Sequence, residues 1–342
     1  MSQHYAGLDV SLDHTHISVL DEAGALVWRG ACPTSPDAIA KSLRERAPCL
    51  ARVGLETGQL STWLTTQLRR RRLPVICLDA RHARAALKLQ LNKSDPGDAY
   101  YLAQIVRTGW YREVAVKSMD AHALRMLLVA RAQLVNQRQT VANTIRGLVK
   151  TFGHIMRPGA KLGFADQVTA ILDDNPRLGA TIGPMLEVWR ALRTQITIMD
   201  RTIVMRAKND PITRRLMTVP GVGPVVGLAY QAVIDDPTRF RSATTVGAYL
   251  GLTPRRWQSG EVDRQGAISR CGDAFLRSYL FEAATTLLSR VGKPSRLKTW
   301  GLALAARTGW KKAKVAVARK LSVLLHRLWV RQTDFVAHFA TT

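Results

Sequence analysis

The sequence has few cysteines, and none of them form a pattern typical of a disulfide framework or a zinc site. Four occur among 342 residues, far apart and without a Cys-x-x-Cys pair. Structural zinc sites and small disulfide-rich domains both need closely spaced cysteines. We therefore expect reduced thiols in a reducing compartment. They are Cys32, Cys49, Cys77 and Cys271.

Long apolar runs are also missing. No stretch of about eighteen uncharged apolar residues occurs, and residues 1–5 lack the charged start and apolar run of a secretory signal. The sequence thus predicts a protein that is neither secreted nor membrane-spanning. We expect it in the cytoplasm, associated with the nucleoid.

Acidic residues are scarce relative to basic ones. The chain has 25 Asp and Glu against 50 Lys and Arg, which gives a formal net charge of +25. A single basic run such as residues 69–72 could be a solvated helix face, but the excess extends along the whole chain. It predicts a polyanionic partner, and nucleic acid fits better than a membrane surface.

The first third of the chain has the pattern of an α/β domain. Alternating residues over 5–31 predict three short strands in a meander, and strands alternating with helices then predict a partly parallel sheet. We expect this domain to cover residues 1–118. The later segments, in the order helix, strand, helix, strand, are 36–46, 52–56, 61–71 and 74–78.

Helical periodicity dominates the rest of the chain, which we expect to be all-α. Apolar residues at helical spacing over 121–148 and 182–203 predict two long helices, which could form a coiled-coil arm for oligomerisation over 119–210. An ordinary helical hairpin packed on its own domain is the alternative. Residues 211–342 predict a helical module with glycine turns, whose last helix, 310–330, packs one face and exposes a basic one.

Two carboxylates fall at informative places in the predicted sheet. Asp9 interrupts an apolar strand, where a lone charge is costly unless a metal ion or another group compensates it. Glu56 ends a strand, and open α/β sheets place their sites at the carboxyl ends of strands. Each residue alone could also simply cap a turn.

Asp95 and Asp98 fall at a predicted helix start, because Asp-Pro-Gly-Asp has the form of an N-terminal turn. Their spacing of three also puts both carboxylates on one helix face, so capping and metal binding are compatible. With Asp9 and Glu56 they predict a site for Mg²⁺ or Mn²⁺. We interpret nearby His14 and His16 as neighbours on one strand face and not as ligands.

Residues 219–224, Val-Pro-Gly-Val-Gly-Pro, have the form of a helix-hairpin-helix turn. Gly221 and Gly223 would let backbone N–H groups approach a DNA phosphate closely. A plain tight turn between two helices is the alternative.

Ser259 stands before a glycine among several arginines that could clamp phosphate oxygens. A serine hydroxyl is a weak nucleophile until a base or metal activates it, so Ser259 would need such help. An ordinary loop serine is the alternative. The arginines are Arg255, Arg256, Arg264 and Arg270.

Together these motifs resemble insertion-sequence transposases of the IS-one-ten type, the DEDD serine recombinases guided by a bridge RNA. Two departures from the family pattern are Leu12, where lysine is common, and Arg270, where lysine is usual. Neither removes a proposed catalytic group. The acidic motifs that carry the resemblance are residues 7–11, 55–58 and 93–99, and those of the C-terminal signature are 219–224, 249–254 and 259–260.

The resemblance implies a RuvC-like or RNase-H-like domain that binds Mg²⁺ and a C-terminal transposase domain in which Ser259 attacks DNA. It implies donor and target double-stranded DNA, a noncoding bridge RNA that selects both, and a homo-oligomer, a dimer or tetramer, in which sites combine. The residues implied as metal ligands are Asp9, Glu56, Asp95 and Asp98.

Two other functions stay open. One is a metal-only junction nuclease, in which water attacks DNA at the carboxylates and Ser259 is structural. The other is a DNA- or RNA-binding protein that keeps the fold without catalysis.

Overall fold

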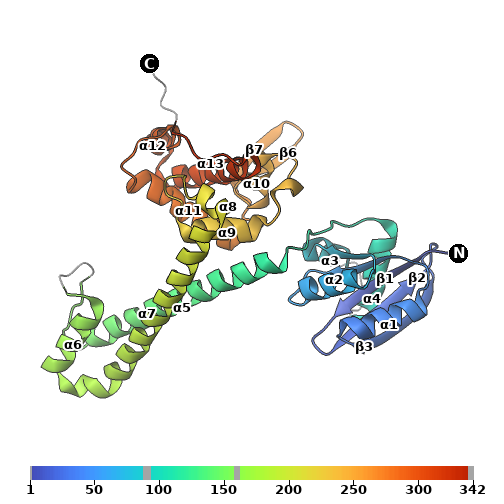
Figure 1. Cartoon of the computed structure of the whole chain (residues 1–342), viewed down its shortest axis with the longest axis horizontal. Helices are drawn as coiled ribbons and strands as arrows, with labels where there is room; N and C mark the ends of the chain where they lie inside the picture. Colours follow the sequence, from blue (N-terminus) through green and yellow to red (C-terminus); the bar gives the residue numbers. More distant parts are fainter. Residues whose placement is uncertain (1, 88–93, 158–161, 338–342) are drawn as a thin grey trace. The chain divides into compact units, whose positions relative to one another are not determined.

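The computed structural model describes residues 2–87, 94–157 and 162–337 and divides into two compact units, Met1–Lys117 and Ser118–Thr342 (Figure 1). Long helices from the predicted arm share a hydrophobic core with the C-terminal helices. The division into three domains at 1–118, 119–210 and 211–342 therefore stays a prediction.

The first unit contains a five-stranded mixed sheet in the order β3-β2-β1-β4-β5. β1, β2 and β3 form the predicted antiparallel meander, while β4 pairs parallel with β1 and β5 parallel with β4. The predicted meander and partly parallel sheet are confirmed. The strands are β1 (His4–Val10), β2 (His14–Leu20), β3 (Leu26–Pro33), β4 (Leu50–Glu56) and β5 (Val75–Leu78).

Helices cover both faces of this sheet. Side chains alternate along β1, so Ala6 and Leu8 pack with α1 (Pro36–Arg46) and α2 (Ser61–Arg70), while Gly7 faces α4 (Asp95–Thr108). α3 (Ala80–Leu87) shares the core on the α4 side. The helices predicted at 36–46 and 61–71 are thus confirmed. Ser35 caps α1 by accepting a hydrogen bond from the Ala38 amide at 3.1 Å.

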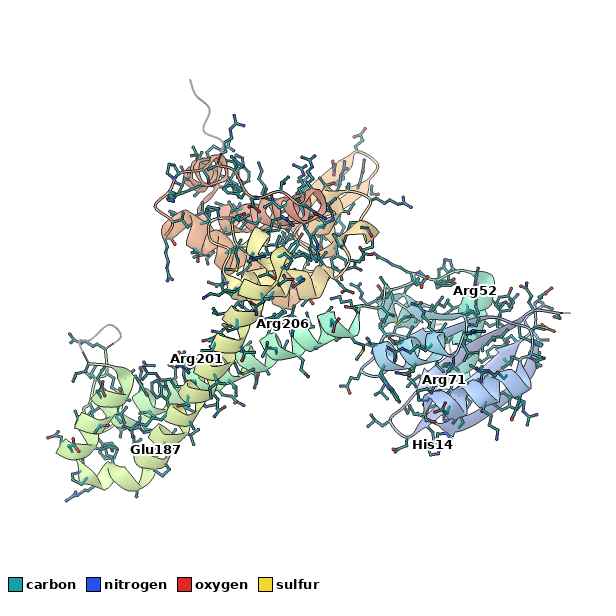
Figure 2. The ribbon with its side chains drawn as sticks, in the orientation of Figure 1. His14, Arg52, Arg71, Glu187, Arg201 and Arg206 are labelled. Atoms are coloured by element: carbon teal, nitrogen blue, oxygen red, sulfur yellow. The ribbon has the colours of Figure 1, made fainter. Side chains whose placement is uncertain are left out.

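The basic run at 69–72 serves the fold in part. Arg71 makes an ion pair with Asp37 at 2.7 Å, and the Arg69 guanidinium donates to the Val75 carbonyl at 2.9 Å. Figure 2 labels Arg71 at the first unit. These two side chains therefore connect α2 to its neighbours.

The second unit begins with two long helices, α5 (Met119–Lys150) and α7 (Gly179–Asn209), which lie side by side in Figure 1. They run antiparallel, because α5 leads away from the C-terminal core and α7 returns to it. At the end nearest the C-terminal helices, Leu124 and Leu128 of α5 share a core with Ile203 and Ala207 of α7. Both predicted long helices are confirmed, whereas coiled-coil packing and self-association stay predictions.

The far end of these helices has its own small core. Ile145 and Val149 of α5 pack with Ile182 and Leu186 of α7, and α6 (Phe164–Asp174) covers them. Between this tip core and the core shared with the C-terminal helices, Arg131 of α5 donates to the Asp200 carboxylate of α7 at 2.8 Å. A short helix, η1 (Pro176–Leu178), precedes α7.

The remaining helices pack around Tyr230, which is fully buried and donates a hydrogen bond to the Ser322 carbonyl at 2.7 Å. α13 buries Val317, Leu321 and Leu325 and exposes lysines and arginines, as expected from its sequence. These helices are α8 (Pro211–Leu216), α9 (Pro224–Ile234), η2 (Pro237–Arg239), α10 (Ala243–Tyr249), α11 (Ala274–Ser289), α12 (Arg296–Thr308) and α13 (Trp310–Arg331).

The C-terminal region is not entirely helical, which corrects the all-α expectation. β6 (Pro254–Ser259) and β7 (Val262–Ile268) form an antiparallel hairpin. Gly260, at the first central position of its two-residue turn, has φ +54°, which matches a type II′ turn. The Trp257 ring lies over Gly266 on the opposite strand, where a Cβ would come within 2.6 Å of it.

Candidate active site

Asp9 and Glu56 lie side by side at the carboxyl edge of the sheet. β1 and β4 are parallel neighbours in which Leu8 pairs with Leu55, so the next residue on each strand is the acid. Both acids line one pocket of about 520 Å³, together with residues that follow each strand. The structure therefore brings two of the four predicted ligands together.

Two glycines let α4 approach this face of the sheet closely. A Cβ at Gly7 would collide with the backbone of α4 at Ala99 and Ala103, and one at Gly54 would collide with Val106. Because side chains alternate along a strand, Asp9 and Glu56 lie on the same face as these glycines. The close packing places α4 over the face that carries both acids.

The direction of α4 brings its N-terminus to the acidic edge. At its other end, Gln104 donates to the Gly24 carbonyl at 3.1 Å and Arg107 donates to the Glu22 carbonyl at 3.0 Å. That turn follows β2 and lies at the opposite edge of the sheet from Asp9, so α4 runs antiparallel to β1.

Asp95 and Asp98 occupy the first turn of α4, behind Ser94. The Ser94 hydroxyl accepts from the Gly97 amide at 3.3 Å, so Ser94 and not Asp95 is the N-cap residue. Asp98 is only 8% exposed. Its carboxylate oxygens are not among the fully buried, unpartnered side-chain atoms of the described residues. Lys93, in the same sequence motif, lies outside the described residues.

His16 also lies beside this group, although from the sequence we interpreted it only as a residue of one strand face. It stands directly opposite Asp9 in the β1–β2 pairing, and its Nε2 lies 3.9 Å from the Asp95 carboxylate. Cross-strand neighbours share one face, so the pairing places His16 between Asp9 and the start of α4. Strand periodicity gave the face of the sheet on which His16 lies, but its neighbour on that face, Asp95, comes from α4.

The acids are not preassembled into a metal cage. Among residues 2–87, 94–157 and 162–337, no three His, Cys, Asp or Glu side chains gather closely enough to hold an ion. Glu56 lies 3.6 Å from the Arg84 guanidinium. The donor types nevertheless fit Mg²⁺ or Mn²⁺, which prefer carboxylate oxygens.

Ser259 lies in the second unit, at the tip of the β6–β7 hairpin. It is the last residue of β6, pairs with Val262, and is exposed like the rest of its strand. An exposed hydroxyl on a tight turn is accessible to a large substrate such as DNA.

The four predicted DNA-contacting arginines differ in how they are engaged. Arg256 makes a double hydrogen bond to Asp263, 2.7 Å at each oxygen, which lowers the pKa of that carboxyl. Arg255 donates to the Ser269 carbonyl at 3.2 Å. Arg264 is exposed on β7. Arg270, two residues beyond the end of β7, adopts φ +55°. Arg256 is thus the one held by an acid.

The turn between α8 and α9 uses its two glycines differently. Gly221 has φ +89°, and a Cβ there would lie 2.7 Å from the Ala283 carbonyl oxygen of α11. Gly223 has an ordinary extended φ of −98° and open space around it. Gly221 is therefore required for packing, while Gly223 leaves the backbone accessible. Phosphate contact by either residue stays a prediction.

Within the described part of the chain, no helix combines the length and apolar character needed to cross a membrane.

Comparison with known proteins identifies the family. A family model described as "Transposase", for DEDD transposases of the IS110 type, matches residues 6–153. The model described as "Transposase IS116/IS110/IS902 family" matches residues 213–299. The two matches include Asp9, Glu56, Asp95, Asp98 and Ser259.

Several curated proteins are similar over most of this chain. The transposase for insertion sequence element IS1111A of Coxiella burnetii is 30% identical, over 77% of this chain and 73% of that protein. A protein assigned to the family 20 transposases in Pseudomonas aeruginosa is 30% identical, over 71% of this chain and 74% of its own length. The Sinorhizobium fredii protein y4pF/y4sB, assigned as a transposase, is 31% identical over 69% of this chain.

The match to y4pF/y4sB spans 62% of that protein. The family inferred from the sequence motifs is confirmed by two family models and by relatives matched over most of their length. The chain therefore belongs to the IS116/IS110/IS902 family of transposases, which are DNA-cleaving and DNA-rejoining enzymes.

Proposed function

We propose that this chain cuts DNA strands and rejoins them through a covalent link to Ser259, with a divalent cation held at the acidic edge of the first unit. The observation that supports this proposal is the adjacency of Asp9 and Glu56 at the carboxyl ends of two neighbouring parallel strands, on the face of the sheet that α4 covers. The strand order and directions support a RuvC-like or RNase-H-like assignment for that unit.

The reaction would conserve the phosphodiester. The Ser259 oxygen forms a bond to phosphorus while the bond from phosphorus to one DNA oxygen breaks, and the serine proton ends on that departing oxygen. A hydroxyl of another DNA strand then attacks the phosphoserine and restores the serine. No ATP is needed, because each step exchanges one phosphate ester for another.

The acidic edge would hold Mg²⁺ or Mn²⁺ through Asp9, Glu56, Asp95 and Asp98. When bound, such a cation stabilises negative charge that develops on a phosphate oxygen. His16 would orient Asp95 from its place opposite Asp9. In the second unit, Arg255, Arg264 and Arg270 would hold the DNA backbone near Ser259.

We further propose that donor and target double-stranded DNA are the substrates and that a noncoding bridge RNA selects them. The protein would form a dimer or tetramer in which the acidic site of one protomer serves Ser259 of another. A net charge of +25 spread along the chain supports contact with a long nucleic-acid surface. Base pairing by RNA would then supply the sequence choice.

Trapping of the covalent intermediate tests the proposal. Purified protein with Mg²⁺, the RNA transcribed beside its gene and paired DNA duplexes should give a protein–DNA adduct that resists denaturation. Ser259→Ala should abolish this adduct, whereas Ser278→Ala should retain it. Ser278 is a suitable control because it is exposed on α11 and its hydroxyl donates to the Ala274 carbonyl of the same helix.

A metal-only junction nuclease is the second candidate, favoured by the pocket that Asp9 and Glu56 share. It predicts that Ser259→Ala still hydrolyses DNA and that no adduct forms with any variant. Cleavage assays with a branched duplex separate the two mechanisms.

A non-catalytic binder predicts that neither site matters. Asp98→Asn and Ser259→Ala would then leave transposition in cells unchanged. We expect each to abolish it, while Glu45→Gln, which removes an exposed charge from α1, leaves it intact.

A further inference from the structure

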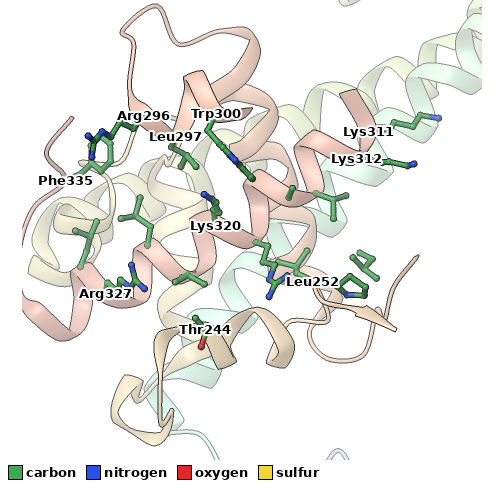
Figure 3. A pocket seen from close by; sticks show the side chains of 18 of the residues that line it. Thr244, Leu252, Arg296, Leu297, Trp300, Lys311, Lys312, Lys320, Arg327 and Phe335 are labelled. Atoms are coloured by element: carbon green, nitrogen blue, oxygen red, sulfur yellow. The ribbon is translucent and has the colours of Figure 1, made fainter. Parts of the chain in front are cut away.

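A groove of about 1600 Å³ lies in the second unit, between α12, α13 and the base of the β6–β7 hairpin (Figure 3). Its lining is mixed in a specific way. Leu252, Ile268, Leu297 and Leu324 contribute apolar surface, while seven of its residues are Lys or Arg and one is acidic. Arg270, one of the arginines proposed to hold DNA, lines it, but Ser259 and the four acids do not.

The positive charge of the groove is not neutralised by the protein. Lys312, Lys320 and Arg327 follow one face of α13, alternating with Ala316 and Val323. None of these cations has an ion pair within the described part of the chain. The single acid, Asp334, lies 3.7 Å from Arg215. The groove therefore offers a polyanion several cations and a single carboxylate, which faces Arg215.

An aromatic ring stands between the cations. Figure 3 shows Trp300 projecting from α12 toward α13, with Lys320 close to it. The Lys320 ammonium lies 3.9 Å from the centre of the Trp300 ring, and Trp300 is partly exposed. Positive groups beside an accessible aromatic face are typical of surfaces that bind single-stranded nucleic acid, where bases stack while phosphates are neutralised.

We propose that this groove binds an unpaired DNA strand, with phosphates on its basic rim and a base against Trp300 and the apolar floor. A base within a duplex is already stacked on both faces and cannot reach such a floor, so phosphate-only contact with a duplex would leave it unused. The inference rests on the proposed function, because it assigns the strand to the DNA that Ser259 cuts.

Continuity with the hairpin supports DNA as the occupant. Gly266, Ala267 and Ile268 of β7 line the groove, and the same strand leads to the turn beside Ser259. From Ile268 to Val262 the strand spans about 20 Å at ~3.3 Å per residue. A DNA strand that lies in the groove would thus continue along the hairpin toward Ser259.

The charge test compares two double variants of the full-length protein. Lys320→Glu with Arg327→Glu alters the groove, and Arg201→Glu with Arg206→Glu makes the same charge change on exposed positions of α7 (Figure 2). Binding of fluorescein-labelled oligothymidylate is followed by anisotropy without divalent cation. We expect the groove variant to bind at least about tenfold more weakly and the α7 variant to bind nearly normally. Equal weakening in both would overturn the proposal.

The stacking test removes bases or the ring. An abasic oligonucleotide should bind the protein with an intact groove about tenfold more weakly than oligothymidylate. Trp300→Leu should cause a similar loss with oligothymidylate but little further loss with the abasic strand. Trp310→Leu, an exposed tryptophan outside the groove, is the control. If the thymidine and abasic strands bind equally to the protein with an intact groove, no base lies in the groove.

Two competitors decide the kind of occupant. Tighter binding of oligouridylate than of oligothymidylate would assign the groove to RNA, and displacement of DNA by an equal amount of polyglutamate would assign it to an acidic protein partner. Either result overturns the DNA assignment. If Trp300→Leu fails to fold, the two charge variants still decide. All measurements use a Ser259→Ala background, so they stand whether or not an adduct forms.

Discussion

At the residue scale, Gly7 and Gly54 allow α4 to pack closely on the face of the sheet that carries Asp9 and Glu56. Replacing Gly7 by alanine would place a methyl group against the backbone of α4 at Ala99 and Ala103, where neither side can yield without moving the helix. We expect Gly7→Ala to lower the free energy of unfolding of the first unit by about 1–3 kcal/mol. Urea denaturation followed by circular dichroism measures this.

Gly58 provides the matched control, since a Cβ there meets no atom within 4 Å. Gly58→Ala should leave the unfolding transition almost unchanged. Equal stability of both variants would show that α4 does not depend on Gly7 for its position.

Tyr230 predicts how stability of the second unit responds to alkali. Complete burial raises the pKa of its hydroxyl well above the ordinary value of 10.0, so the folded state holds this proton more tightly than the unfolded state. The resulting stabilisation is complete below pH 10 and is lost as the pH rises above it.

Thermal unfolding between pH 8 and pH 12 checks this dependence on Tyr230. We expect the melting temperature of Tyr230→Phe to fall less steeply over that range, although it starts lower because the Ser322 carbonyl loses its donor. Parallel curves would mean that other groups dominate the alkaline transition.

Sequence reasoning reached some residues of the site and not others. Asp9, within the first predicted strand, and Glu56, at the end of a later one, could be assigned to the same sheet, and in the structure they line one pocket. His16 could not, because its contact with Asp95 depends on a helix that follows it by nearly eighty residues in the chain. Strand periodicity gives the face of a side chain but not what covers that face.

At the scale of elements, the turn between α8 and α9 separates two uses of glycine. Gly221→Ala should destabilise the second unit by about 1–3 kcal/mol, because it combines a strained φ with a collision at α11. Gly223→Ala should leave stability nearly unchanged. If the Gly223 amide approaches a phosphate, this variant should instead weaken duplex binding, as measured by anisotropy.

One substitution in the β6–β7 hairpin should strengthen DNA binding instead of weakening it. Asp263 holds Arg256 by two hydrogen bonds and adds a negative charge within a few residues of Ser259. Asp263→Asn frees the arginine and removes the charge, so we expect DNA to bind about threefold to tenfold more tightly at low salt. Glu187→Gln, on the long helix α7, is the control and should have little effect. Unchanged affinity in Asp263→Asn would show that Arg256 does not contact DNA.

Most elements could be predicted because their sequence signals are local. Ser35-Pro36 marks the start of α1, and the apolar spacing in α5 and α7 sets their length. The β6–β7 hairpin escaped because arginines and a serine dominate it and every residue of β6 is exposed, so no buried face imposes an apolar alternation. The glycine in its turn and Trp257 were the available signals.

At the scale of the whole molecule, the charge of +25 should make DNA binding strongly dependent on salt. A protein that makes about six phosphate contacts loses ~10³-fold in affinity between about 50 and 200 mM salt. We expect at least this loss for duplex DNA, measured by anisotropy at several salt concentrations. A loss of less than about tenfold would mean that few of the 50 basic residues contact the backbone.

α5 and α7 share a hydrophobic core with the helices of the module that carries Ser259, and this core connects their far end to that module. Leu124, Leu128, Ile203 and Ala207 are embedded among residues of α9, α11 and α13, while Ile145 lies about 26 Å farther along α5 at ~1.5 Å per residue. The helix pair is therefore anchored at one end in the hydrophobic core of the second unit. A force that displaces its other end would shift α5 and α7 against the helices of the module that carries Ser259.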